Sequence, residues 1–356
     1  MSLLINPFAA CSSTVKRWVH SHKDPFYRLK KTTFSPEFLT QFQPYFDTHL
    51  NHSLTALDQE RRHTLKRMII QTFCIFPFIL GWAWMFYHPT SFAGLNIQHP
   101  ELLNLIGTMS LLVGLGFIWS PVVRFKIKTK ERIIPPILHY FDPSFVYQCQ
   151  SPFKSRDLTP FGILPLHDIS KYEDYISGHF KQTFIELTEC TLQKKIVEYR
   201  NRKQHVRHVT LFHGLFVVLE MNKPFNGKTV ILRDEGAIGN LFQNRMSGLQ
   251  KVSLEDPRFE KQFEVISSDQ IEARYLLTPS FMERLLELSN TFSHKLQCSF
   301  LNNQILLMIP CQGNLFETTT LFKSLSFEAT IHPLLKELEV ILGIVDTLKL
   351  NEKTRI

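Results

Sequence analysis

Three histidines lie close together in the middle of the chain, at His205, His208 and His213. Imidazole side chains at short spacing are common ligands of zinc and other transition metals. The stretch from His208 to Met221 (HVTLFHGLFVVLEM) is rich in β-branched and aromatic residues, which predicts a strand. On a strand, His208 and His213 point to opposite faces, and His205 lies roughly 26 Å from His213. The pattern therefore predicts no metal site, and we interpret the histidines as an exposed basic strand end.

Basic residues surround these histidines, and Glu198 is the one acidic residue among them. Such a cluster suits lipid headgroups or an acidic protein partner, because both are anionic. Nucleic acid is not expected, since the chain carries no recognised fold signature for it; a solvated loop is the alternative. We predict a basic loop and candidate interaction surface over 194–207, beside the exposed edge of a hairpin over 208–232. Its members are Lys194, Lys195, Arg200, Arg202, Lys203 and Arg207.

Two carboxylates, Asp269 and Glu272, are three residues apart and would share one face of a helix. Paired carboxylates perform acid–base catalysis only in a cleft that shifts a pKa. Helix capping by Asp269 explains the pair more simply. The glycines of Gly236-Ala-Ile-Gly239 lack the further glycine and the βαβ context of a dinucleotide site, and there is no Gly-x-Ser-x-Gly or Walker motif. We therefore predict no catalytic, cofactor-binding or small-molecule site.

The cysteines are widely and irregularly spaced, with no Cys-x-x-Cys pair, so neither a zinc site nor a disulfide framework is indicated. Scattered single thiols fit a reducing compartment. The six are Cys11, Cys74, Cys149, Cys190, Cys298 and Cys311.

Two uncharged apolar runs extend from Met68 to Tyr87 and from Leu102 to Val123. About 20 helical residues cover the ~30 Å hydrocarbon layer of a bilayer. A buried core hairpin is the alternative, but two such runs in tandem are rare in soluble folds. We therefore predict two membrane spans, and the formal charge of +8 fits a membrane protein with basic flanks.

The basic residues beside the runs indicate an orientation. The connecting loop, 88–101, holds no Lys or Arg. By the positive-inside rule, both termini are then cytoplasmic and the loop faces outward. The flanking cations are Arg61, Arg62, Lys66 and Arg67 before the first run, and Arg124, Lys126, Lys128, Lys130 and Arg132 after the second.

The spans divide the chain into four parts. Residues 1–34 form a basic N-terminal extension, and residues 35–67 an amphipathic helix that begins with Ser35 as its N-cap. The transmembrane hairpin covers 68–123, and a cytoplasmic domain covers 131–356. The helical stripe that needs a partner consists of Phe38, Phe42, Phe46, Leu50, Leu54 and Leu57.

The cytoplasmic domain carries several strand and turn signals. Residues 133–141 predict a short helix, interrupted by its prolines, and 172–196 predicts strands around Ser177-Gly178. The strand 208–221 is expected to pair with 228–232 through the Asn226-Gly227 turn, and 296–309 predicts a hairpin around Asn302-Asn303.

The stretch from Leu254 to Leu288 combines a strand end with helix caps. Asp269, or a neighbouring serine, can cap a short helix, and Thr278-Pro279 starts another. A final helix is expected over 333–348. Antiparallel hairpins with grouped helices indicate an α+β fold: an N-terminal helix, a transmembrane hairpin, and a mixed domain packed by C-terminal helices.

Four stretches together resemble the bacterial family called domain of unknown function 3137, over roughly residues 140–351. They are SKYEDYISGHF, LFHGLFVVLEMNKPFNGKTVIL, VSLEDPRFEKQFEVISSDQIEARYLLTPSFMERLLEL and LKELEVILGIVDTLKLN. The resemblance implies a two-span bacterial membrane protein with a soluble C-terminal domain and no established activity. It also implies a LemA-type membrane protein as a candidate partner, because the two are often encoded together.

These observations favour a binding or scaffold module, anchored in a bacterial inner membrane, that engages a protein partner or the lipid surface at its cytoplasmic face. A membrane-tethered enzyme without a recognised motif is one alternative, and it requires a deep pocket with convergent polar groups. A second alternative is an exported protein whose hairpin inserts into a target membrane.

Overall fold

The computed structural model describes residues 36–87, 100–154, 156–200, 203–221, 224–233, 248–292, 295–317, 321–348 and 350. The chain divides into two compact units. We call the one that contains 36–136 and 317–335 the helical unit, and the one that contains 137–316 and 336–356 the sheet unit. The predicted basic extension, 1–34, and the predicted helix cap Ser35 lie outside the described residues.

The helical unit begins with α2 (Pro36–His49) and α3 (Asn51–Tyr87) and continues in α4 (Pro100–Phe141). The predicted amphipathic helix is therefore shared between α2 and the first turns of α3. Five residues of its apolar stripe are buried, and the rings of Phe42 and Phe46 lie 6.4 and 5.0 Å from that of Phe327. The stripe thus packs on the 317–335 segment, which contains the π-helical turn η5 (Phe327–Ile331).

Two stretches of the described helices, Asn51–Trp84 and Leu105–Phe141, are long and apolar enough to cross a membrane. Their apolar windows are unburied, and Phe73, Phe78 and Val113 are 75%, 76% and 69% exposed. A core helix of a soluble protein would bury such side chains, so this exposure fits a lipid environment better.

The α4 helix runs through Pro121, Pro135 and Pro136 without a break. The separate, interrupted helix predicted over 133–141 is therefore wrong. Ile133, Ile134, Ile137 and Leu138 are all buried around the proline pair. We attribute the continuity to this packing, which outweighs the local cost of proline.

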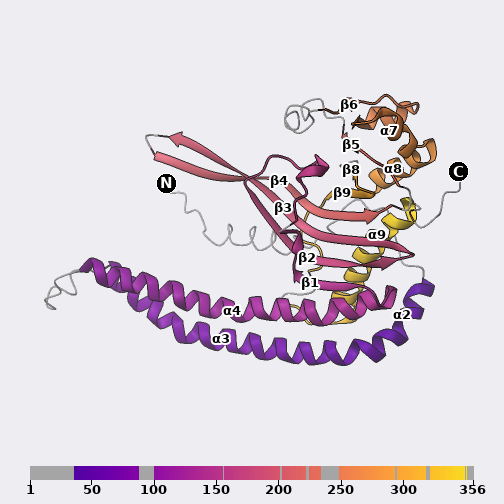
Figure 1. Cartoon of the computed structure of the whole chain (residues 1–356). Helices are drawn as coiled ribbons and strands as arrows, with labels where there is room; N and C mark the ends of the chain where they lie inside the picture. The colour runs from indigo at the N-terminus through magenta and orange to yellow at the C-terminus, as the bar shows by residue number, and fades with distance from the viewer. Residues whose placement is uncertain are drawn as a thin grey trace, which may run out of the picture. The chain divides into compact units, whose positions relative to one another are not determined.

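Among the described residues, the sheet unit contains nine antiparallel strands in the order β1-β2-β3-β4-β9-β8-β5-β7-β6, most of which are labelled in Figure 1. The strands are β1 (Val146–Gln150), β2 (Ile169–Phe180), β3 (Thr183–Arg200), β4 (Lys203–Glu220), β5 (Lys228–Arg233), β6 (Gln250–Lys251), β7 (Phe263–Ser267), β8 (Gln297–Leu301) and β9 (Gln304–Pro310). This α+β architecture, with helices grouped after the main strands, confirms the predicted fold class.

The central strands carry apolar side chains at consecutive positions. Because consecutive side chains point to opposite faces of a sheet, both faces of these strands are buried. Phe216 and Val218 of β4 join one core cluster, which the segment with η2 (Pro152–Lys154) and η3 (Thr159–Phe161) covers through Phe153 and Phe161. Successive side chains of a strand point to opposite faces, so Val217 lies on the other side, where it is also fully buried.

Helices follow the strands in the C-terminal part of the sheet unit. They are α6 (Pro257–Gln262), α7 (Gln270–Leu276), α8 (Pro279–Thr291) and α9 (His332–Leu348). Phe281 of α8 meets Phe300 of β8 edge to face at 5.9 Å, and Lys181 in the β2–β3 turn pairs with Asp346 of α9 at 2.7 Å. These contacts attach helices to the sheet.

The helix caps predicted in the 254–288 stretch are confirmed. Asp269 accepts hydrogen bonds from Ile271 N and Glu272 N, and Thr278 accepts one from Phe281 N. Asp256 caps α6 in the same way, which the sequence reading did not predict. The dense signals of this stretch therefore specify local structure.

The predicted turn at Ser177-Gly178 is wrong. The chain turns at Lys181 and Gln182, whose φ angles are 47° and 69°. Gly178 lies inside β2, where a Cβ atom would come within 2.7 Å of the Phe145 Cα atom. The glycine therefore permits a close backbone approach, which sequence alone does not distinguish from a turn.

The predicted pairing of 208–221 with 228–232 is also wrong. β4 lies between β3 and β9, whereas β5 pairs with β7 and β8. The β8–β9 hairpin is confirmed, with Asn302 and Asn303 at φ 51° and 59°. Local turn signals therefore predicted one hairpin correctly, but not which strand lies beside β4.

Candidate interaction surface on the β3–β4 ribbon

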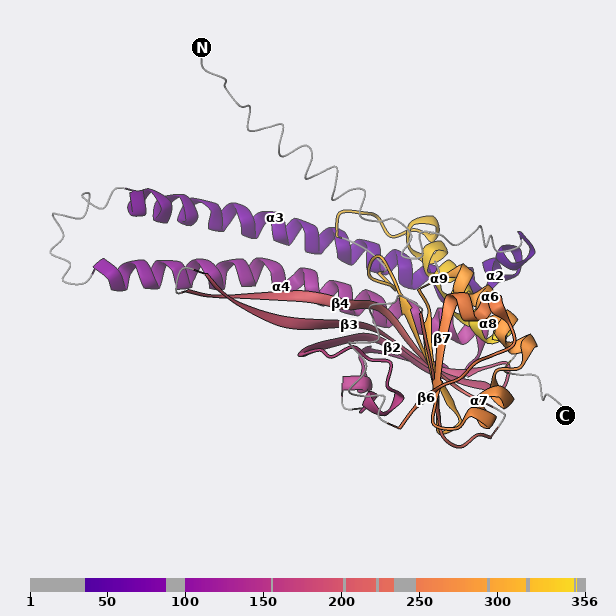
Figure 2. The same cartoon turned by 90° about the horizontal axis from the view of Figure 1, so that it is seen from above.

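The basic segment predicted as a loop is instead the outer part of the β3–β4 hairpin. We call residues 194–200 and 203–209 the β-ribbon. Pairing of β2 with β3 ends at Ile169↔Gln193, and pairing of β4 with β9 ends at Gly214↔Pro310. Within the described part of the chain, the strands of the β-ribbon therefore pair with each other alone. Figures 1 and 2 show them extending beyond the rest of the sheet.

Five of the six predicted cations belong to the β-ribbon. Lys194, Lys195 and Arg207 are exposed, and Arg200 pairs with Lys203 at the last rung of the ladder. Arg202 lies outside the described residues. The Arg207 guanidinium is 3.8 Å from the Glu198 carboxylate, and both side chains are more than 60% exposed.

An apolar pair lies between these cations. Val197 and Val206 face each other across the ladder and are 40% and 46% exposed. Lys195 and His208 form the pair two residues further from the tip, so all four side chains share one face. The β-ribbon thus presents an exposed apolar rung flanked by basic side chains.

Two features mark where the β-ribbon leaves the sheet. Asp168 donates from its backbone N to Gln193 O at 2.9 Å and accepts from Lys195 N at 2.7 Å, just before β2 begins. The ladder also shifts register at Leu192/Gln193, which leaves Leu211 as an extra residue in β4. Bulges bend and twist a strand pair, so this one sets the direction of the β-ribbon.

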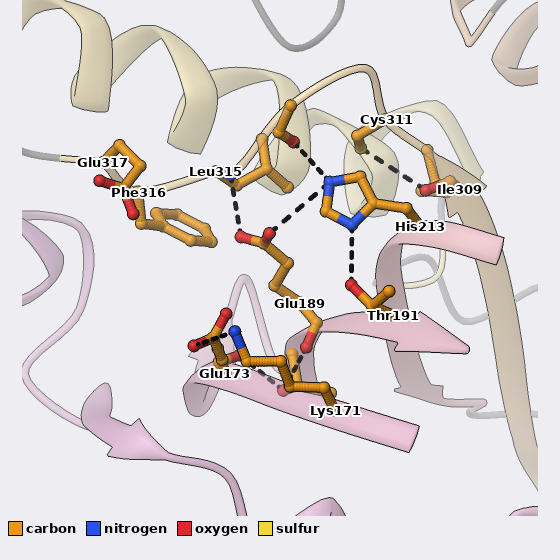
Figure 3. A network of polar contacts seen from close by, with 12 residues as sticks. Lys171, Glu173, Glu189, Thr191, His213, Ile309, Cys311, Leu315, Phe316 and Glu317 are labelled. Atoms are coloured by element: carbon orange, nitrogen blue, oxygen red, sulfur yellow. Dashed lines mark hydrogen bonds and ion pairs between the residues drawn. The ribbon is translucent and has the colours of Figure 1, made fainter. Parts of the chain in front are cut away.

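A polar network lies at the base of the β-ribbon (Figure 3). His213 pairs with Thr191 across the ladder, and its Nδ1 atom is 2.9 Å from the threonine Oγ1 atom. Its Nε2 atom donates to Gly313 O at 3.1 Å and lies 3.9 Å from Oε1 of Glu189. Glu189, only 4% exposed, accepts a 2.9 Å hydrogen bond from Leu315 N.

This network fastens the 311–316 segment to the sheet. Cys311 N donates to His213 O at 3.0 Å, and Phe316 N donates to the Glu337 carboxylate at 2.8 Å. Burial, with the nearby carboxylates of Glu189 and Glu337, raises the pKa of the Cys311 thiol far above its usual range. A thiol that stays protonated is a poor nucleophile, so we assign the network a structural role.

The other candidate residues have structural roles or lie apart. Glu272 accepts a hydrogen bond from Asn226 N, while Asp269 caps α7. His205 and His208 pair with Glu198 and Lys195 on the ladder, away from His213. Among the described residues, no three His, Cys, Asp or Glu side chains are grouped to hold a metal ion. Gly236 and Gly239 lie outside the described residues.

Sequence reasoning missed both the β-ribbon and the Glu189 network. The β-branched and aromatic residues Ile196, Val197 and Tyr199 were a usable strand signal within the predicted loop. No comparable signal linked Glu189 to Leu315, because the strand register and the path of the 311–316 segment bring them together.

Comparisons with known proteins support one relationship. No curated protein sequence matches the chain. One solved structure, the crystal structure of the mycobacterial trehalose monomycolate transport factor A, TtfA, aligns with 57% of this chain and 88% of that chain. Its sequence identity is 10% and its TM-score is 0.26, so this likeness carries no argument here. Residues 210–350 match the family model described as "Protein of unknown function (DUF3137)", the family that the sequence resembles.

Proposed function

We propose that this chain is a membrane-anchored binding or scaffold module and that the β-ribbon is the element that contacts its partner. The observation that carries the proposal is the extension of a basic two-stranded ribbon beyond the sheet, with an exposed apolar rung. Exposed apolar side chains framed by polar ones are typical of interaction surfaces.

The location belongs to the same proposal. Two apolar stretches of sufficient length anchor the chain, and the basic residues at their ends favour a cytoplasmic orientation in a bacterial inner membrane. In that orientation, the β-ribbon lies on the side where anionic lipids and protein partners are both accessible.

Photocross-linking in intact cells tests the proposal. Val206 is replaced by the photoreactive residue p-benzoylphenylalanine, and a matched variant carries it at Ile271, an 81% exposed residue of α7. We expect a discrete product from position 206 that is missing from position 271. The product should disappear when Arg200, Arg202 and Lys203 are all replaced by Glu, since the cations would then repel an anionic partner.

Two outcomes would contradict the proposal. One is the same set of products from both positions, which would indicate random collision. The other is a product from position 206 that survives the triple charge reversal. Mass spectrometry of the product distinguishes a protein from a lipid.

A further inference from the structure

We infer that the partner of the β-ribbon is the anionic surface of a lipid bilayer, with the Val197–Val206 rung inserted between the headgroups. This inference rests on the proposed function and names the partner. Three features favour a lipid partner: the charge of the β-ribbon, its apolar rung, and the membrane anchor of the chain.

The charge of the 194–207 segment is strongly unbalanced. Residues 194–207 hold six basic residues and one acidic residue, Glu198. The Glu198 carboxylate has Arg207 as a neighbour, so it offers little repulsion to an approaching anion. A lipid surface rich in negative headgroups attracts such a segment without requiring a specific arrangement of its charges.

The apolar rung favours lipid over an acidic protein surface. Val197 and Val206 are exposed side by side, with Lys195 and His208 on the same face. At a bilayer surface, apolar side chains can enter the boundary between headgroups and acyl chains while cations contact the phosphates. An acidic peptide would satisfy the cations but would leave the two valines in water.

The geometry of the β-ribbon and the anchor of the chain also suit lipid. Seven residues of extended strand reach about 23 Å at roughly 3.3 Å per residue. The two apolar stretches keep the chain at a bilayer, so even a weak contact benefits from a high local concentration of lipid. A fluid surface also requires no shape complementarity from a narrow two-stranded element.

Vesicle co-flotation tests the inference with the full-length protein. The protein is held in phosphatidylcholine nanodiscs and mixed with vesicles of phosphatidylcholine alone or with added phosphatidylglycerol. We expect binding to the anionic vesicles to exceed binding to the neutral ones by more than about tenfold and to weaken as salt is added.

Two variants separate the contributions of charge and insertion. Arg200→Glu with Arg202→Glu and Lys203→Glu should reduce affinity by more than about tenfold. Val197→Ser with Val206→Ser should reduce it about threefold to tenfold, because less apolar area is transferred. A matched control reverses three exposed lysines outside the β-ribbon and should bind like the wild type: Lys154→Glu, Lys261→Glu and Lys323→Glu.

The results decide between lipid and protein. Equal binding to neutral and anionic vesicles would overturn the inference. So would a Val197→Ser and Val206→Ser variant that has the wild-type melting temperature and binds anionic vesicles with the wild-type affinity. Absence of vesicle binding, together with a protein cross-linked at position 206, would overturn the lipid partner and leave the proposed binding function intact. If neither vesicle binding nor a cross-linked product at position 206 is found, both the lipid partner and the proposed binding function are overturned.

Discussion

Glu189 is a buried carboxylate beside a histidine, an arrangement that often suggests catalysis. Its contacts point to a different role, because one oxygen accepts from Leu315 N and the other faces His213. The histidine in turn donates to Gly313 O. These bonds satisfy backbone groups of the 311–316 segment, which follows β9 in the chain.

Replacing Glu189 tests this structural role. We expect Glu189→Ala to lower the free energy of unfolding by about 1–3 kcal/mol, because Leu315 N would be left buried without its acceptor. Glu189→Gln should cost less, since the amide oxygen can still accept. Thermal unfolding of both variants in detergent provides the comparison, and equal losses would argue against the role assigned to this hydrogen bond.

Within the helical unit, a hydrogen bond attaches the 317–335 segment to α3, and ion pairs attach it to α4. Lys126 and Lys130 of α4 lie 2.8 and 3.5 Å from the Glu317 carboxylate, and the Arg61 guanidinium of α3 donates to Leu321 O at 2.9 Å. All three cations are among those predicted from the sequence to flank the membrane spans. A cation can both flank a span and bind the 317–335 segment, because the positive-inside rule counts cations whether or not they are paired.

The Glu317 cluster predicts a pH dependence. Burial alone would raise the pKa of Glu317, but the charge of Lys130 and the hydrogen bond and charge of Lys126 outweigh it and hold the pKa below its ordinary value. A lowered carboxyl pKa stabilises the fold at neutral pH, and this contribution is lost as pH falls through the lowered pKa. Glu317→Gln should therefore cost about 1–2 kcal/mol at neutral pH and progressively less on acidification.

Melting temperatures measured between about pH 6 and pH 3 check this expectation. The gap between the wild type and Glu317→Gln should close toward acid pH. Glu287→Gln, at an exposed carboxylate of α8, should show no such gap at any pH. A gap for Glu317→Gln that is independent of pH would show that the carboxylate charge is not what stabilises the segment.

Sequence predicted the elements whose causes are local. Thr278 followed by Pro279 favours a helix start, with the threonine as N-cap and the proline in the first turn. Asn302-Asn303 favours the left-handed backbone conformation of the turn that it forms. Gly178 has the residue type of a turn, but its reason is the nearby backbone of Phe145, which directly precedes β1. Strand order and the Glu189 network depend on such distant contacts, so local patterns do not specify them.

At the scale of the whole molecule, the two units differ in what they expose. The helical unit carries two exposed stretches long and apolar enough to cross a membrane. The sheet unit buries both faces of its central strands and carries the β-ribbon outside that core. Since residues 197–200 and 203–206 pair with each other alone in the described structure, the core does not require them.

Shortening the β-ribbon tests this division most directly. Residues 197–206 are deleted, and Ile196 is joined to Arg207 by an Asn-Gly turn. Both the full-length and the shortened chain carry p-benzoylphenylalanine at His208, an exposed position that the deletion keeps. We expect the melting temperature to change by less than about 2 °C, because the described strand residues that are deleted pair only with each other. The cross-linked product of intact cells should be lost. A shortened chain that unfolds, or one that retains the product, would contradict the account of the β-ribbon as the binding element.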